Sequence, residues 1–71
     1  MKPLRQRVLQ LFREMKKDQL DLHVLFEAAG NDPAERREVL EALDELAREG
    51  LLEPRSGDFY VLTEKGRRAL R

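Results

Sequence analysis

The charged side chains of this 71-residue sequence fall into three blocks, two of which could bind phosphate. Residues 1–17 contain six basic side chains and one acidic one, and residues 55–71 contain five basic and two acidic ones. Between them, residues 18–54 contain eleven acidic and three basic side chains, so the net charge of zero conceals basic ends around an acidic centre. Because lysine and arginine attract phosphate, we expect any contact with nucleic acid to be made first by these ends.

Side chains suited to catalysis or to metal binding are few. His23 is the only histidine, Ser56 is the only serine, and there is no cysteine. A metal site would need further histidines or cysteines, and Ser56 has no neighbouring base in the sequence to activate it. We therefore expect no enzyme, no metal site and no cofactor, and we interpret His23 as a half-buried structural residue.

Length and composition predict one small domain over residues 1–71. Hydrophobic residues make up 41% of the chain and charged residues 39%, which is typical of a soluble globular protein. The apolar runs are too short to span a membrane, and no charged segment followed by an apolar run indicates a secretion signal. Because there are also no cysteines, we expect a cytoplasmic protein with no membrane partner.

The spacing of apolar residues predicts two helices in the first half of the chain. A helix over about 3–16 follows from apolar residues repeated every three or four positions, with Pro3 at the first helical position. The residues of this apolar face are Leu4, Val8, Leu11, Phe12 and Met15. A second helix is expected over about 21–29, with Asp21 as its N-cap and Gly30 at its end.

A third, longer helix is expected over about 33–49. Asp32 can cap its first turn, Pro33 suits its first position, and Glu35 can reach back to the cap. The face expected to be buried consists of Val39, Leu40, Leu43, Leu46 and Ala47. Gly50 is expected in the left-handed conformation that ends many helices.

The remaining residues predict a hairpin and a last helix. Strands near 51–54 and 59–62 are joined by the turn residues Arg55-Ser56-Gly57-Asp58, and Leu20 could supply a further short strand. Thr63 can cap a helix over about 64–70. The predicted fold class is mainly α with a small β-hairpin: a three-helix core, a two- or three-stranded antiparallel wing and a short C-terminal helix.

Two sequence patterns resemble the winged helix-turn-helix of MarR-, PadR- and ArsR-like transcriptional regulators. They are Val39-x3-Leu43-x2-Leu46-x3-Gly50-Leu51-Leu52 and Tyr60-Val61-Leu62-Thr63-Glu64-Lys65-Gly66. The matching order of elements covers essentially the whole chain. The resemblance implies a transcriptional regulator that binds double-stranded DNA and acts as a homodimer.

In the families that it resembles, the third helix enters the major groove and the hairpin contacts the flanking DNA backbone. The resemblance therefore implies DNA contacts at the first turn of the third helix, at the tip of the hairpin and on the last helix. The candidate residues are Arg36, Arg37, Arg55, Lys65, Arg67 and Arg68.

The solvent face expected for the third helix is unusually acidic for a helix that reads DNA. Its residues are Ala34, Arg37, Glu38, Glu41, Asp44, Glu45 and Arg48. Carboxylates repel phosphate, so the body of this helix is disfavoured for deep insertion into a groove. Arg37 with Glu41 and Asp44 with Arg48 could instead form ordinary ion pairs on a solvated face. The alternative hypothesis is a protein–protein interaction module whose acidic helix face binds a basic protein partner.

Overall fold

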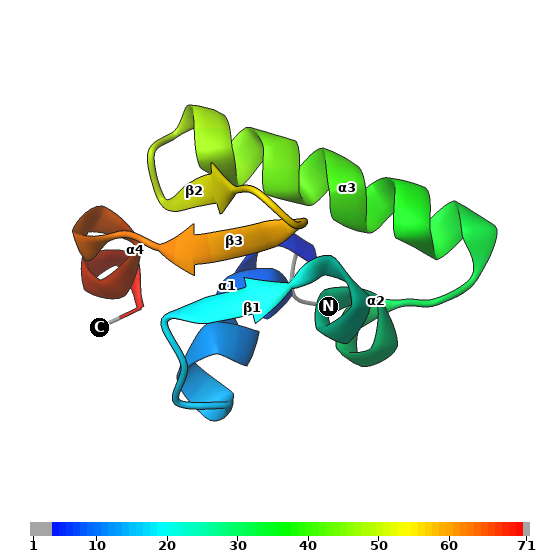
Figure 1. The fold of residues 1–71 in the computed structure, drawn as a ribbon, viewed down its shortest axis with the longest axis horizontal. Helices are drawn as coiled ribbons and strands as arrows, with labels where there is room; N and C mark the ends of the chain where they lie inside the picture. Colours follow the sequence, from blue (N-terminus) through cyan, green and yellow to red (C-terminus); the bar gives the residue numbers. More distant parts are fainter. Residues whose placement is uncertain (1–3, 71) are drawn as a thin grey trace.

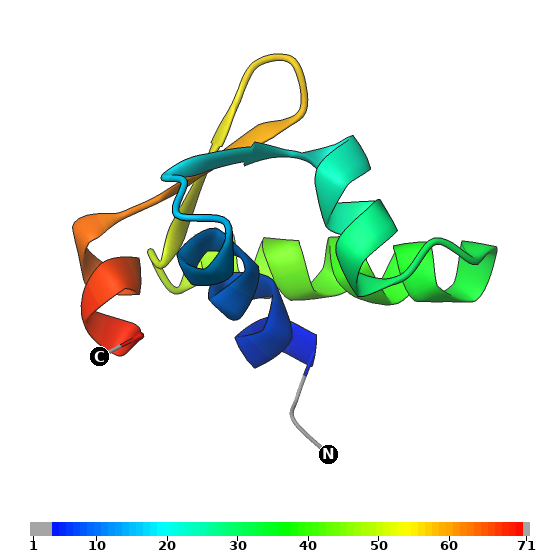
Figure 2. The ribbon, with the colours of Figure 1, turned by 90° about the horizontal axis from the view of Figure 1, so that it is seen from below.

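The computed structural model describes residues 4–70, which form four helices and a three-stranded antiparallel sheet. The elements follow in the order α1 (Leu4–Glu14), β1 (Gln19–Asp21), α2 (Leu22–Ala29), α3 (Pro33–Arg48), β2 (Leu52–Arg55), β3 (Phe59–Leu62) and α4 (Glu64–Ala69). Figures 1 and 2 show the sheet on one side of α1 and α3, with α2 and α4 at opposite ends of the molecule. The prediction of a mainly helical chain with a small antiparallel sheet is confirmed.

The sheet has the strand order β1-β3-β2, so the last strand of the chain lies in the middle. Tyr60 of β3 is opposite Leu20 on one side and Pro54 on the other. Pro54 lacks a backbone donor and is tolerated because β2 is an edge strand. The predicted further strand at Leu20 is confirmed as β1, and Arg55 belongs to β2 instead of the turn.

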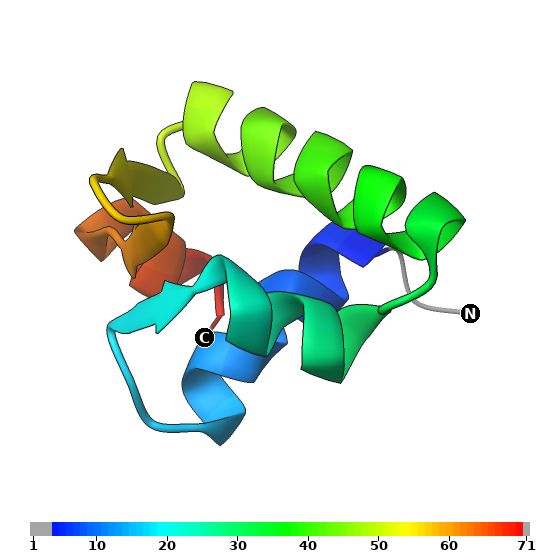
Figure 3. The ribbon, with the colours of Figure 1, turned by 45° about the vertical axis from the view of Figure 1, so that its right-hand side comes forward.

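One hydrophobic core joins the three longer helices to the sheet. Its buried side chains are Val8, Leu9, Phe12, Leu20, Leu25, Ala29, Val39, Ala42, Leu43, Leu46, Leu51, Leu52 and Leu62. Among the helices, α1 packs most extensively against α3 (Figure 3). The core therefore buries one side of α3 and leaves the other side of this helix open to solvent.

Two residues predicted to face inward do not. Met15 is 43% exposed and Leu40 is 44% exposed. Met15 lies just beyond the last residue of α1, where the chain leaves the helical path. Leu40 lies at the margin of the buried face and keeps a large part of its side chain exposed, whereas Ala42 takes the buried position that the prediction missed.

Local side-chain caps account for where the helices begin. The side chain of Asp21 accepts a hydrogen bond from the backbone nitrogen of Val24 at 2.9 Å, as predicted. The backbone nitrogen of Asp32 donates to Glu35 Oε1 at 3.3 Å, and the Gly66 nitrogen donates to the Thr63 hydroxyl at 3.0 Å. These contacts confirm the predicted starts of α2, α3 and α4 to within a residue.

Residues in the left-handed conformation follow the ends of α1 and α3. Gly50 has a φ of 79°, which confirms the predicted stop after α3. α1 ends earlier than predicted because Lys16 has a φ of 54° and turns the chain away. The Lys17 nitrogen then donates to the Phe12 carbonyl at 3.1 Å, which closes the helix. The predicted start at Pro3 lies outside the described residues.

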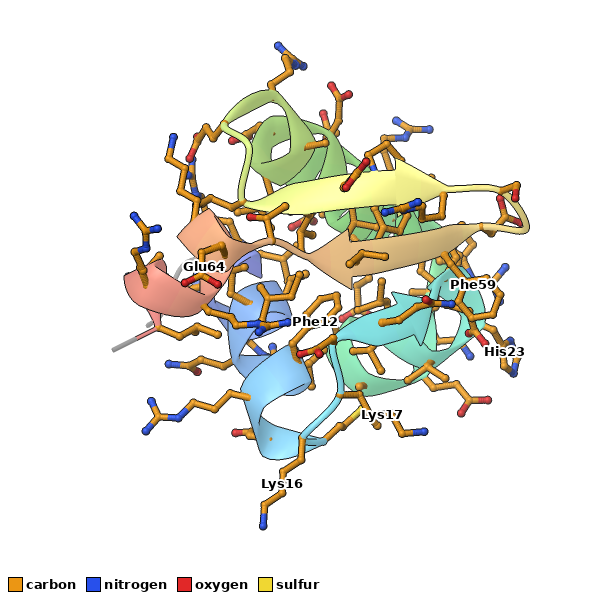
Figure 4. All side chains as sticks on the ribbon, turned by 60° about the vertical axis from the view of Figure 1, so that its left-hand side comes forward. Phe12, Lys16, Lys17, His23, Phe59 and Glu64 are labelled. Atoms are coloured by element: carbon orange, nitrogen blue, oxygen red, sulfur yellow. The ribbon has the colours of Figure 1, made fainter. Side chains whose placement is uncertain are left out.

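His23 differs from its prediction as a half-buried residue. Its side chain is 80% exposed on α2, and its Nε2 lies 2.8 Å from Glu27 Oε1, one helical turn away (Figure 4). The apolar neighbours of His23 in sequence point inward from other positions of the helix turn, so the histidine itself faces solvent. Within residues 4–70, no helix has the length and apolar character needed to cross a bilayer.

Candidate nucleic-acid interface

Arg36 lies in the first turn of α3, but its side chain folds back onto the turn that precedes the helix. Its Nε and Nη2 donate to Asn31 Oδ1 at 3.0 and 2.8 Å. The guanidinium carbon also lies 5.3 Å from the centroid of the Phe26 ring, a cation–π geometry. Arg36 therefore ties α2 to α3 and is not free to reach a ligand without breaking these contacts.

Replacing Arg36 with alanine is expected to lower the free energy of unfolding by about 1 kcal/mol, because two hydrogen bonds and the contact with Phe26 are lost. Urea unfolding followed by circular dichroism measures the change. The matched control is Arg37→Ala, the neighbouring arginine, for which we expect a change of less than about 0.5 kcal/mol. Equal losses in the two variants would contradict the structural role of Arg36.

Arg37 is the candidate that remains available. It is exposed in the first half of α3, and its side chain makes no ion pair or hydrogen bond with any other residue of the described range. The predicted pair with Glu41 is therefore wrong, whereas the predicted pair between Asp44 and Arg48 forms. The hydrogen bond to Asp44 raises the pKa of the Arg48 guanidinium above its ordinary value, so Arg48 stays charged.

The four acidic residues predicted on the solvent face of α3 are exposed, and two of them, Asp44 and Glu45, lie in ion pairs. Arg48 pairs with Asp44, and Arg5 of α1 lies 3.6 Å from Glu45 and hydrogen-bonds to Glu49 just after the helix. The bond to Glu49 raises the pKa of the Arg5 guanidinium above its ordinary value. Glu38 and Glu41 are the carboxylates of this face that have no ion pair with another described residue.

The four basic candidates outside α3 all have partners. Arg55 Nη2 lies 3.4 Å from Glu53 Oε2 within β2, and Lys65 Nζ donates to the backbone carbonyl of Glu49 at 2.8 Å. Arg67 Nη2 lies 3.0 Å from Asp18 Oδ2, and Arg68 Nε lies 3.8 Å from Glu64 Oε1. These side chains are all at least partly exposed, so their ion pairs are weak and can be exchanged for phosphate.

The six candidates do not form one continuous patch. Arg36 and Arg37 lie at the start of α3, whereas Lys65 caps the carbonyl of Glu49 beyond its other end, about 18 Å away along the helix axis. Arg55 lies on the hairpin, which projects away from the helices in Figure 2. This arrangement would favour contact with a ligand through the first half of α3 and the hairpin instead of along the whole of α3.

Leu40 is a candidate contact that the sequence analysis missed. The helical period assigned it to the core, but it is 44% exposed, one helical turn after Arg37. An exposed leucine beside an unpaired arginine presents apolar and cationic groups on the same stretch of helix.

Compared with protein-family models, with curated proteins and with solved structures, the chain shows no match.

Proposed function

We propose that this chain is a winged helix-turn-helix protein that binds double-stranded DNA and regulates transcription. The observation that carries the proposal is the layout: α3 has one face open to solvent and is followed by a projecting antiparallel hairpin, with strand order β1-β3-β2. This is the arrangement implied by the resemblance at residues 39–66. A homodimer, which the resemblance also implies, would let two copies of α3 contact half-sites about 34 Å apart.

In this proposal the first two turns of α3 make the contacts in the groove. Arg37 can donate two hydrogen bonds to the O6 and N7 atoms of guanine, and Leu40 can pack on a thymine methyl group. A carboxylate such as Glu41 can accept from cytosine. Arg5 and Arg48 reduce the repulsion between phosphates and the second half of α3, because they neutralise the acidic side chains there.

The test is the affinity for a mixed-sequence DNA duplex, measured by fluorescence anisotropy over a range of salt concentrations. Arg37→Ala is expected to weaken binding about tenfold or more, because a charged donor without another partner is lost. Arg7→Ala is the matched control, because it removes the same charge from an exposed position on α1 outside the proposed contacts, and we expect it to change affinity by less than about threefold. The proposal fails if the duplex does not bind even at the lowest salt concentration, where phosphate contacts are strongest.

A second candidate function, binding of a basic protein partner, is favoured by one specific feature. A hollow of about 320 Å³ lies between α1 and α3. Its lining consists of Glu38, Glu41 and Glu45, of Arg5, and of the apolar residues Leu4 and Ala42. Three carboxylates against one guanidinium would accept a lysine or arginine side chain. Saturable binding of a lysine-rich peptide that is lost in Glu38→Gln/Glu41→Gln, with no DNA binding at low salt, would select this function over the first.

A further inference from the structure

A second hollow lies at the other side of α1, away from the exposed face of α3. It has a volume of about 440 Å³ and lies between the C-terminal end of α1, the connection to β1, and α4. We call it the α1–α4 hollow. Figures 1 and 3 show the connection after α1 on one side of the molecule and α3 on the other, so a ligand here would not meet a DNA duplex bound to α3.

The rim of the α1–α4 hollow carries a surplus of positive charge. Among residues 4–70, the cations Arg13, Lys16, Lys17 and Arg67 line it, against the single carboxylate of Asp18. Arg67 is 3.0 Å from that carboxylate, and Arg13 Nη1 donates to the Leu70 carbonyl at 3.1 Å.

Neither of the two lysines forms an ion pair with any residue between 4 and 70. Lys16 and Lys17 follow directly after α1 and are exposed, and Figure 4 places both at the end of this helix. Asp18 compensates one of the four cations, so the hollow requires a ligand with more than one negative charge to be neutral.

The backbone at Lys16 supports a role for its side chain. Its φ of 54° belongs to the left-handed region, which glycine adopts freely and which is disfavoured for residues with a Cβ. Glycine is the usual residue at this position after a helix. The lysine at this position places its ammonium group at the rim, although its backbone conformation is unfavourable for a residue with a Cβ.

The floor of the hollow is apolar. It is formed by Phe12 and Leu62, both almost fully buried, and by the partly buried Leu70. A cationic rim above an apolar floor suits an anion attached to an organic body, and the volume lies in the range of pockets for small molecules. Lysine ammonium groups are common ligands of phosphate.

We propose that the α1–α4 hollow binds the phosphate group of a small molecule, with Lys16, Lys17 and Arg67 as the cationic contacts. A phosphomonoester or a polyphosphate carries the two or more negative charges that the rim requires. The site is separate from the DNA contacts of α3 and does not depend on them.

The proposal is tested by adding adenosine monophosphate, and in a second experiment sodium pyrophosphate, to the isotope-labelled protein at low salt. We expect saturable changes in the amide resonances of residues 13–18 and 67–70, without comparable changes at the start of α3. Tighter binding of the nucleotide would assign an organic phosphate, and tighter binding of pyrophosphate a free polyphosphate. Absence of saturable changes with both probes would overturn the site.

Lys16→Gly separates ligand binding from folding. It is expected to weaken about tenfold the binding of whichever of the two probes binds more tightly. The melting temperature should stay unchanged or rise, because glycine adopts the left-handed conformation without a steric penalty. Lys17→Gln should weaken binding in the same direction without changing a left-handed residue. The matched control is Arg7→Gln, which changes an exposed cation of α1 outside the hollow and should change the affinity for the probe by less than about twofold. An equal loss in Arg7→Gln and Lys16→Gly would show unspecific attraction and refute the site.

Discussion

Replacing Gly66 with alanine is expected to destabilise the protein by about 3 kcal/mol. In an isolated helix the same change would stabilise the helix by about 1 kcal/mol. A Cβ at this position would lie 2.6 Å from Leu62 Cδ1 and closer still to the backbone oxygen of Leu51. That oxygen also accepts hydrogen bonds from the backbone nitrogen and the hydroxyl of Thr63, at 3.2 and 3.0 Å. The carbonyl of Leu51 therefore cannot move away without losing the contacts that hold the start of α4.

The decisive result for Gly66→Ala is whether the free energy of unfolding falls or rises. A domain of this size has a free energy of unfolding of only about 3–5 kcal/mol, so the variant would retain about 0–2 kcal/mol, and we expect it to be partly unfolded or to have a detached α4. Thermal and urea unfolding of both proteins measure the change. Arg68→Ala, at an exposed neighbouring position, is the control and should change stability by less than about 0.5 kcal/mol. A more stable Gly66→Ala protein would mean that α4 does not pack on Leu51 as described.

Leu43→Ala is expected to lower the free energy of unfolding by about 3–4 kcal/mol. Leu43 is fully buried on the face of α3 that joins the core, so truncation removes apolar burial and leaves a cavity. Leu40→Ala is the matched control, because it is the same substitution in the same helix, one turn earlier. Leu40 is 44% exposed, and we expect its truncation to cost less than about 1 kcal/mol.

The comparison of the two leucines tests which face of α3 is buried. Urea unfolding of both variants gives the two free-energy changes directly. Leu40→Ala should also weaken binding of duplex DNA if its side chain packs on thymine methyl groups, whereas Leu43→Ala should act only through stability. Similar losses of stability in the two variants would indicate that α3 is rotated relative to the described packing.

The starts of α2, α3 and α4 could be predicted from the sequence because the signals are local. The side chains of Asp21 and Thr63 accept hydrogen bonds from backbone nitrogens three residues later, and the Asp32 nitrogen donates to Glu35, so these contacts do not depend on the rest of the fold. The same holds for Gly50, whose left-handed backbone follows from the lack of a side chain. Lys16 was missed as the end of α1 because lysine is not a local signal for that conformation.

The surroundings of the candidate site residues were harder to predict than the elements that carry them. The sequence identified basic side chains but not all of their partners, some of which come from distant parts of the chain: Asp18 for Arg67, and Glu49 for Arg5 and Lys65. Such pairs exist only after α1, α3 and α4 have packed. Arg36 and Arg37, adjacent in sequence, also differ in availability, because the Arg36 side chain folds back onto Asn31 and Phe26, which residue type alone does not reveal.

The sequence by itself determined the order and type of the elements, the positions of their caps and the buried face around Val39, Leu43 and Leu46, because periodicity and capping act over three or four residues. Only the tertiary structure decided that Leu40 remains exposed and that Arg37 stays unpaired within residues 4–70. It also brought the end of α1 and α4 together around the cationic hollow. These features depend on which surfaces cover one another, and that is a property of long-range packing.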